Sequence, residues 1–286
     1  MFARPTNGNT VQNENSDPLP RFGGFTLIEL LAIIAMLAVL GSMLVTTMAT
    51  TRTNTFTFQC MNNLRQLGAA WKMYADDNEG RLVYNHDGGN NGLAAGAESW
   101  VAGWLDFSSN TANTNIALLI DHTRYPYGAY LGPYLRSASV FKCPADRSVV
   151  LQTLQPTPRV RSVSMSNFGN CRTWSMVNRY KLYTDITQFR SPATVFIILE
   201  ERPDSINDGT FFTDPDTRYQ LIDYPASFHN AACNFSFADG HSELHRWTDP
   251  RTVPVLAPGQ LLQLNVNLPG DVDVDWLAQH ASEMIQ

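Results

Sequence analysis

Apolar side chains form one unbroken stretch near the N-terminus of the chain. From Leu30 to Thr51 the sequence contains no ionisable side chain. A run of this kind is about the length that a helix needs to cross the hydrocarbon core of a bilayer. One carboxylate, Glu29, directly precedes it, and a lone acid on a spanning helix is costly enough to indicate a function. The pattern predicts a transmembrane helix, and hydrophobicity alone does not distinguish a plain N-terminal membrane anchor from a helix with a further function.

The helical pattern continues beyond this run with a different periodicity. Apolar residues recur at spacings of three and four between Met61 and Tyr74, which predicts an amphipathic helix that packs one face on its own domain. Gly80 suits the C-terminal end of such a helix. The expected organisation is a leader over residues 1–24, a transmembrane and assembly helix over 25–80, and a globular exported domain over 81–286.

Short apolar segments separated by turn residues follow, and they predict β-strands. The clearest is the β-branched run over 194–199, which suits a central strand. A second candidate covers 139–143 and ends at Pro144, and a third, weaker one covers 210–212. Near the C-terminus Asp275 is a reasonable N-cap for a short helix that reaches Met284.

The segments 233–238 and 241–247 flank Asp239-Gly240, a dipeptide typical of two-residue β-hairpin turns. A two-residue turn would place Phe235 opposite Leu244. It would also put Phe235 and Phe237 on the core face and His241, Glu243 and His245 on the other face. Together these elements predict an α+β fold: a pilin-like long N-terminal helix, with a membrane-spanning half and an amphipathic half, packed on an antiparallel β-sheet domain.

Composition narrows the functional classes. Charged residues make up 16% of the chain and aromatic residues 11%, so the part outside the apolar run should fold around a true core. The net charge of −6 argues against nucleic-acid binding, which needs a basic face. The four cysteines, Cys60, Cys143, Cys171 and Cys233, allow three complete disulfide pairings, and buried thiols are the alternative.

The hexapeptide from Gly24 to Glu29 resembles the processing site of type IV pilins and type II secretion pseudopilins. The resemblance implies that prepilin peptidase cuts between Gly24 and Phe25 and that the new amine of Phe25 is methylated. It also implies that Glu29 pairs with the Phe25 amine of a neighbouring subunit during assembly. The basic residue Arg21 would stay on the cytoplasmic side. The leader is longer than is usual in type IV pilins, which leaves the true start codon open.

A second motif lies at the other end of the chain. His229, nine further residues and then Asp239-Gly240 resemble the His-x9-Asp-Gly motif of prepilin-associated C-terminal domains. The stretches 60–68, 74–78 and 141–144 are similar to other segments of that family. This resemblance implies a pseudopilin-like subunit and no established catalytic activity.

Two groups of residues invite a metal hypothesis. His229, Asp239, His241 and His245 include zinc-ligand types, but His241 and His245 would lie about 13 Å apart on a regular strand. A contact between His229 and the turn is the simpler expectation. Asp204, Asn207 and Asp208 are weak calcium candidates, because calcium prefers oxygen ligands, although the segment does not fit an EF-hand loop. The expectation is therefore no cofactor, with calcium at these three residues as the alternative.

The sequence therefore predicts a structural subunit, a pseudopilin or minor pilin, of a type II secretion or type IV pilus-like fibre. The expected partners are other subunits through the N-terminal helix, prepilin peptidase, an inner-membrane assembly platform and membrane lipid. The expected location is the inner membrane, single-pass, with the C-terminal domain exported to the periplasm or in a fibre. The alternatives are a membrane-tethered binding module that does not polymerise and a metal-dependent hydrolase. No nucleophile elbow or phosphate-binding loop is present, so no enzyme activity is expected.

Overall fold

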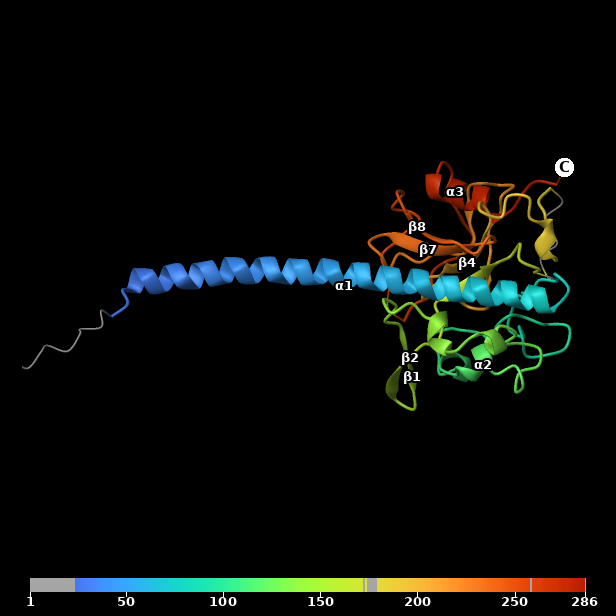
Figure 1. Cartoon of the computed structure of the whole chain (residues 1–286), viewed down its shortest axis with the longest axis horizontal. Coiled ribbons are helices and arrows are strands. Elements are labelled where there is room, and N and C mark those ends of the chain that lie inside the picture. The colour runs from blue at the N-terminus through green and yellow to red at the C-terminus, as the bar shows by residue number, and fades with distance from the viewer. Residues whose placement is uncertain (1–23, 172, 174–178, 258, 286) are drawn as a thin grey trace, which may run out of the picture. The chain divides into compact units, whose positions relative to one another are not determined.

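The computed structural model describes residues 24–286 apart from 172, 174–178, 258 and 286 (Figure 1), and it leaves the side chains of 41–54 undescribed. The chain divides into two compact units, Met1–Met48 and Ala49–Gln286. The predicted leader over 1–24 lies outside the described residues, except for Gly24.

One helix, α1, runs from Leu27 to Asp77. Gly80 ends it: its backbone has φ +86°, and its N–H donates to the Ala75 carbonyl at 2.8 Å. A glycine with positive φ is the usual residue at this position because it lacks the Cβ that would be strained there. In the second unit, Leu64, Leu67 and Trp71 of α1 belong to the main hydrophobic core.

The predicted transmembrane helix is wrong. Within the described residues, no helix combines the length and the apolarity needed to cross a membrane. This finding also overturns the single-pass inner-membrane localisation and the membrane-spanning half of the predicted fold.

A five-stranded sheet forms the centre of the second unit, in the order β5-β3-β4-β7-β8. Its strands are β3 (Val163–Ser166), β4 (Phe196–Glu200), β5 (Thr210–Phe211), β7 (Ala232–Phe237) and β8 (Ser242–Arg246). All neighbouring pairs are antiparallel except β3 and β5, which are parallel. Every residue of β4 and β7 is buried, as expected for strands covered on both faces.

Two smaller sheets lie apart from the central one. They pair β1 (Val149–Gln152) with β2 (Gln155–Pro158), and β6 (Gln220–Leu221) with β9 (Val266–Asn267). The short helices are α2 (Ala117–Ile120), η1 (Thr111–Asn113), η2 (Gly132–Tyr134), η3 (Ala138–Phe141) and η4 (Ile186–Gln188). The predicted fold class is therefore wrong: in place of one antiparallel sheet behind a half-transmembrane helix, the domain has a mixed sheet and two separate ribbons.

Of the three predicted strands described above, two are confirmed and one is wrong. The strand over 194–199 is confirmed as β4 and the segment over 210–212 as β5. The strand over 139–143 is wrong, because this segment forms the 3-10 helix η3. Ser137 starts that helix by accepting a hydrogen bond from the Ser139 N–H through its side chain, a local bond that competes with extended structure.

The hairpin of β7 and β8 is present, but its register differs by one residue from the prediction. Phe235 lies opposite Glu243, and Asn234 lies opposite Leu244. The turn has three residues, closed by a bond from the Phe237 N–H to the His241 carbonyl, and Gly240 has φ +97°. Such a loop, with glycine in the left-handed position, shifts the pairing by one and moves the histidines to the face of Phe235.

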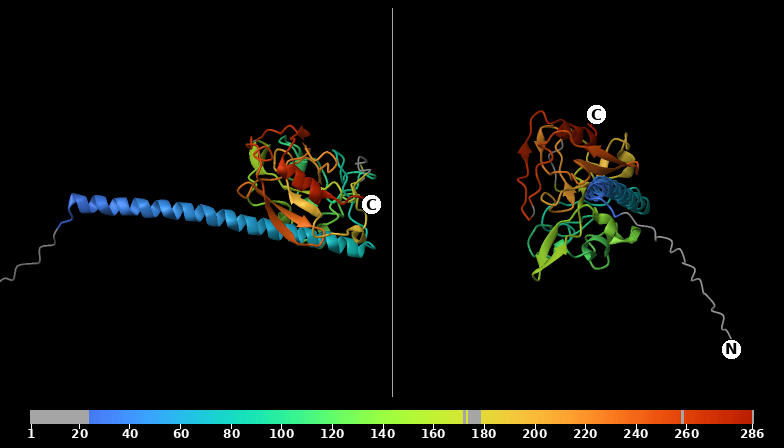
Figure 2. Two further views of the ribbon diagram at one scale, coloured as in Figure 1. Left: turned by 90° about the horizontal axis from the view of Figure 1, so that it is seen from above. Right: turned by 90° about the vertical axis from the view of Figure 1, so that its left-hand side faces the viewer.

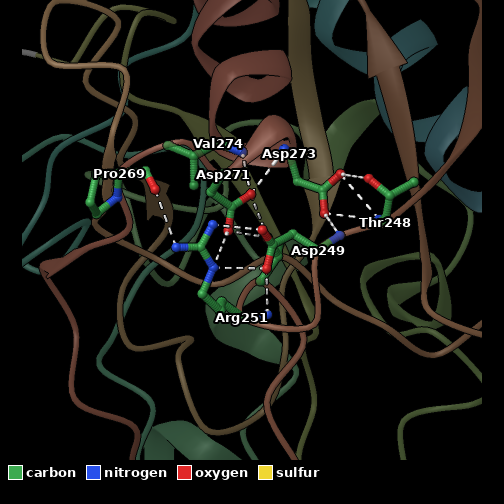
Figure 3. A network of polar contacts seen from close by, with 8 residues as sticks. Thr248, Asp249, Arg251, Pro269, Asp271, Asp273 and Val274 are labelled. Carbon is green, nitrogen blue, oxygen red and sulfur yellow. Dashed lines mark hydrogen bonds and ion pairs between the residues drawn. The ribbon is translucent and has the colours of Figure 1, made fainter.

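The C-terminal helix α3 (Val272–Ala281) begins four residues before the predicted position. Its N-cap is Asp271, whose carboxylate accepts from the N–H groups of Asp273 and Val274, whereas Asp275 lies within the helix. Asp273 in turn accepts from the N–H groups of Thr248 and Asp249 (Figure 3). The helix packs on the central sheet (Figure 2), where the rings of Trp276 and Phe235 lie 5.0 Å apart.

Candidate functional site

The predicted cleavage site is exposed. Gly24 has no atom within 4 Å of the position that a Cβ would take, and the Phe25 side chain is 79% exposed. Arg21 and the remainder of the leader lie outside the described residues. Among the described residues, no side chain packs against Gly24 or Phe25 in a way that would obstruct a peptidase.

Glu29 has a local partner that the sequence reading missed. Its Oε2 accepts from the Thr26 N–H and the Thr26 hydroxyl, both at 2.8 Å, and the Glu29 N–H approaches Thr26 Oγ1 at 3.3 Å. This reciprocal arrangement is a capping box, and it starts α1. Hydrogen bonds from the backbone and then the side chain of Thr26 lower the pKa of Glu29. The Thr-x-x-Glu spacing was visible in the sequence and could have identified the cap.

The residues from 24 to 40 form what we call the N-terminal apolar segment. Every one of these side chains is exposed, including Leu27 at 76% and Leu37 at 63%. Soluble monomers rarely leave so large a contiguous apolar surface in water. The segment is therefore a candidate interaction surface.

A second candidate site lies inside the globular unit. Cys60, Cys143, Glu200 and His229 are all buried, and one ligand atom from each lies within 4.8 Å of the others. We call these four residues the His229 cluster. They come from α1, the loop after η3, the end of β4 and the loop before β7. Among the described residues, this is the group of His, Cys, Asp or Glu side chains whose ligand atoms lie close enough together to hold a metal ion.

Within the cluster, Cys60 and Cys143 form a disulfide with their Cα atoms 5.4 Å apart. None of the three complete pairings is formed: Cys60 and Cys143 are bonded, whereas Cys171 and Cys233 are buried thiols outside the disulfide. His229 Nε2 lies 3.5 Å from Cys143 Sγ and 3.1 Å from Glu200 Oε2, and His229 Nδ1 lies 3.1 Å from Thr57 Oγ1.

Glu200 is fixed by neighbours on β7. Its Oε2 accepts from the backbone N–H and the side-chain amide of Asn234 at 2.9 and 3.0 Å. The Glu200 carbonyl accepts from Cys233 Sγ at 3.2 Å. Burial, followed by the nearby Glu200 charge, raises the pKa of the Cys233 thiol well above its ordinary value. Cys233 is therefore an unreactive neighbour of the cluster.

The predicted contact between His229 and the turn is wrong. Strand β7 occupies most of the nine residues between His229 and Asp239, so the two lie at opposite ends of a strand about 20 Å long. Asp239 pairs with His241 at 2.6 Å, and Lys72 of α1 donates to the Asp239 carbonyl at 3.1 Å. Gly240 closes the turn. The motif thus marks both ends of β7.

The other predicted metal residues already have partners. The His245 ring stacks on Trp276 at 3.7 Å, and burial lowers its pKa. Of the calcium candidates, Asp204 forms an ion pair with Arg202 at 2.5 Å. Asp208 accepts from the N–H groups of Gly88 and Thr210 at 2.7 Å, and Asn207 accepts from the N–H of Asp208. These three side chains carry no calcium proposal.

A buried acidic group near the sheet escaped sequence analysis. Burial raises the pKa of Glu201 to about 8, although hydrogen bonds from Ser164 and Ser205 oppose the shift. Burial and then Glu201 raise the pKa of Asp223 well above its ordinary value. The Asp223 carboxylate accepts from the Phe212 N–H at 2.7 Å. No local sequence pattern brings these acids together, because they belong to different loops.

Comparison of the chain with family models, curated proteins and solved structures finds no match. The family resemblance therefore rests on the two sequence motifs and the three similar segments, and its functional implications stay predictions.

Proposed function

We propose that the chain is a structural subunit of a pilus-like fibre of the type II secretion or type IV class. In this proposal it is processed between Gly24 and Phe25 and assembles through the N-terminal apolar segment. The observation that carries the proposal is that residues 24–40 are all exposed and that their helical part, from Leu27, is apolar on all sides apart from Glu29. Such a helix is normally buried, and the proposed cover is the same segment of neighbouring copies.

Charge favours copies of the same chain as the partner. The segment carries one ionisable side chain, Glu29, and cleavage would create one amine, on Phe25. Bringing the two together between subunits neutralises both charges as they leave water, which a buried ion requires. The exposed position of Glu29 keeps its carboxylate accessible for this exchange of partners.

The first test is N-terminal sequencing and intact-mass measurement of the protein isolated from cells, together with its detection in sheared fibre fractions. A start at methylated Phe25 and recovery in fibres are expected. An unprocessed Met1, or a processed protein that never enters fibres, would contradict the proposal. The second result would favour an exported binding module that does not polymerise.

The role of Glu29 can be separated from its capping bond. Glu29→Gln removes the charge but keeps a side chain that can complete the capping box, whereas Glu29→Ala removes both. We expect both variants to be cleaved normally and to assemble poorly to the same degree. The matched control is Glu79→Ala, which removes an exposed carboxylate near the other end of the helix. Normal assembly of Glu29→Gln would show that capping, and not charge, is what matters.

A further inference from the structure

We infer that, when its disulfide is reduced, the His229 cluster is a structural zinc site with Cys60, Cys143, Glu200 and His229 as ligands. This inference is independent of fibre assembly. Two sulfurs, one imidazole nitrogen and one carboxylate oxygen are a donor set that zinc accepts in tetrahedral sites. A disulfide alone needs neither a histidine nor a glutamate beside it.

The distances in the cluster fit this chemistry. Zinc bonds of about 2.0–2.3 Å place tetrahedral ligand atoms about 3.3–3.8 Å apart. His229 Nε2 already lies 3.5 Å from Cys143 Sγ and 3.2 Å from Glu200 Oε1. All four donor atoms lie within 4.8 Å of one another. Reduction frees the two sulfurs to separate, so shifts of about 1 Å or less complete the site.

The surrounding residues orient the ligands in the way that metal sites require. Thr57 Oγ1 lies 3.1 Å from His229 Nδ1 and so directs Nε2 toward the sulfurs. Asn234 holds Glu200 Oε2 through two hydrogen bonds and leaves Oε1 facing His229 Nε2 at 3.2 Å. Such outer contacts fix ring and carboxylate orientation in metal sites.

A route from solvent reaches the cluster. A hollow of about 280 Å³ is lined by Thr57, Phe58, Met61, His229, Asn230, Leu244 and Arg246. It brings solvent to the His229 side of the site, while each ligand residue remains at most 2% exposed. A fully buried set of four protein ligands is typical of a structural site and leaves no open position for a substrate.

The disulfide and the metal use the same sulfur atoms, so the two states exclude each other. A dithiol reductant transfers two electrons to the Cys60–Cys143 bond, becomes a cyclic disulfide itself and leaves two thiols on the protein. Zinc then displaces the two thiol protons, which are released to solvent. The zinc-bound state replaces the covalent link between α1 and the η3 loop with a coordinate one.

The test measures zinc bound by the full chain. Metal is first removed, the protein is reduced with dithiothreitol or left oxidised, and excess zinc is then added. The reduced protein is expected to retain about one zinc per chain after gel filtration, and the oxidised protein none. Cobalt(II) in place of zinc should give the absorption bands of tetrahedral thiolate coordination. Near-ultraviolet circular dichroism monitors the fold in each sample.

Variants locate the site. Glu200→Gln and His229→Gln should each weaken zinc binding at least tenfold, and Thr57→Val should weaken it about 10–100-fold through lost orientation of His229. Cys171→Ser, which changes a buried cysteine outside the cluster, should bind zinc like the parent chain. The inference is overturned if the folded, reduced chain takes up no stoichiometric zinc, if it unfolds despite excess zinc, or if Cys171→Ser loses the metal as Glu200→Gln does.

Discussion

The Cys60–Cys143 disulfide should supply a large share of the stability of the globular unit. It joins residues separated by 83 positions in the sequence. In the chain-entropy relation, a closed loop of that size lowers the entropy of the unfolded chain enough to stabilise the native state by about 4–5 kcal/mol. Domains are typically stable by about 5–15 kcal/mol, so its removal is a severe perturbation.

The perturbation is the double variant Cys60→Ala/Cys143→Ala, and the assay is urea unfolding followed by the fluorescence of the buried residues Trp71 and Trp100. A chelator in every sample keeps metal binding from restoring the link. With a denaturant slope of about 3 kcal/mol per molar urea, the midpoint should fall by about 1.5 M. The parent chain treated with dithiothreitol should show a similar fall.

The control is Cys171→Ala, which makes the same substitution at a buried cysteine outside the disulfide. It removes comparable packing but closes no loop, so its midpoint should lie well above that of the double variant. If the double variant and the control unfolded within about 0.5 kcal/mol of each other, the loop-closure reasoning would be refuted.

Two further predictions concern pH and close packing. The raised pKa of Asp223 means that the native chain keeps a proton that the unfolded chain has lost, so stability should fall as pH rises above the ordinary carboxyl value of 3.8. Urea unfolding at pH 5.5 and 8.0 should show a loss of stability with rising pH in the parent chain and a smaller loss in Asp223→Asn. The exposed control Asp216→Asn should lose as much as the parent chain. Greater stability of the parent chain at pH 8.0 would contradict this prediction. A Cβ on Gly132 would lie 2.0 Å from the Ile120 carbonyl oxygen, whereas one on Gly89 would meet nothing within 4 Å. Gly132→Ala should therefore lower the thermal midpoint by several degrees, equivalent to about 1–3 kcal/mol, and equal midpoints for Gly132→Ala and Gly89→Ala would argue against it.

Local patterns predicted the elements better than their details. The β-branched run over 194–199 gave a correct strand because its signal is continuous over its whole length. The hairpin at Asp239-Gly240 was found, but its register depended on whether Asp239 also adopts positive φ, which the dipeptide alone does not decide. The N-cap of α3 was misplaced because Asp271, Asp273 and Asp275 alternate along the sequence with nothing local to rank them. Tertiary contacts distinguish them: Thr252 donates to Asp271, and Thr248 donates to Asp273.

The candidate sites also differ in how far they could be predicted from local sequence. Glu29 and Thr26 are three residues apart, so their bond could have been predicted from spacing. The His229 cluster could not, because its residues lie on four elements spread from Cys60 to His229 and meet only through tertiary folding. The transmembrane prediction is contradicted by the finding that, among the described residues, no helix has the length and apolarity of a membrane span.

The bond between Cys60 and Cys143 also decides how the molecule would respond to mechanical force. Helix α1 is continuous from Leu27 to Asp77, so tension applied near its start would travel along it to Cys60. There the disulfide would divert the load into the loop after η3 before it reached Leu64, Leu67 and Trp71, which pack in the core. The oxidised protein should therefore resist unfolding when it is pulled from its N-terminal end, and a reducing environment should remove that resistance.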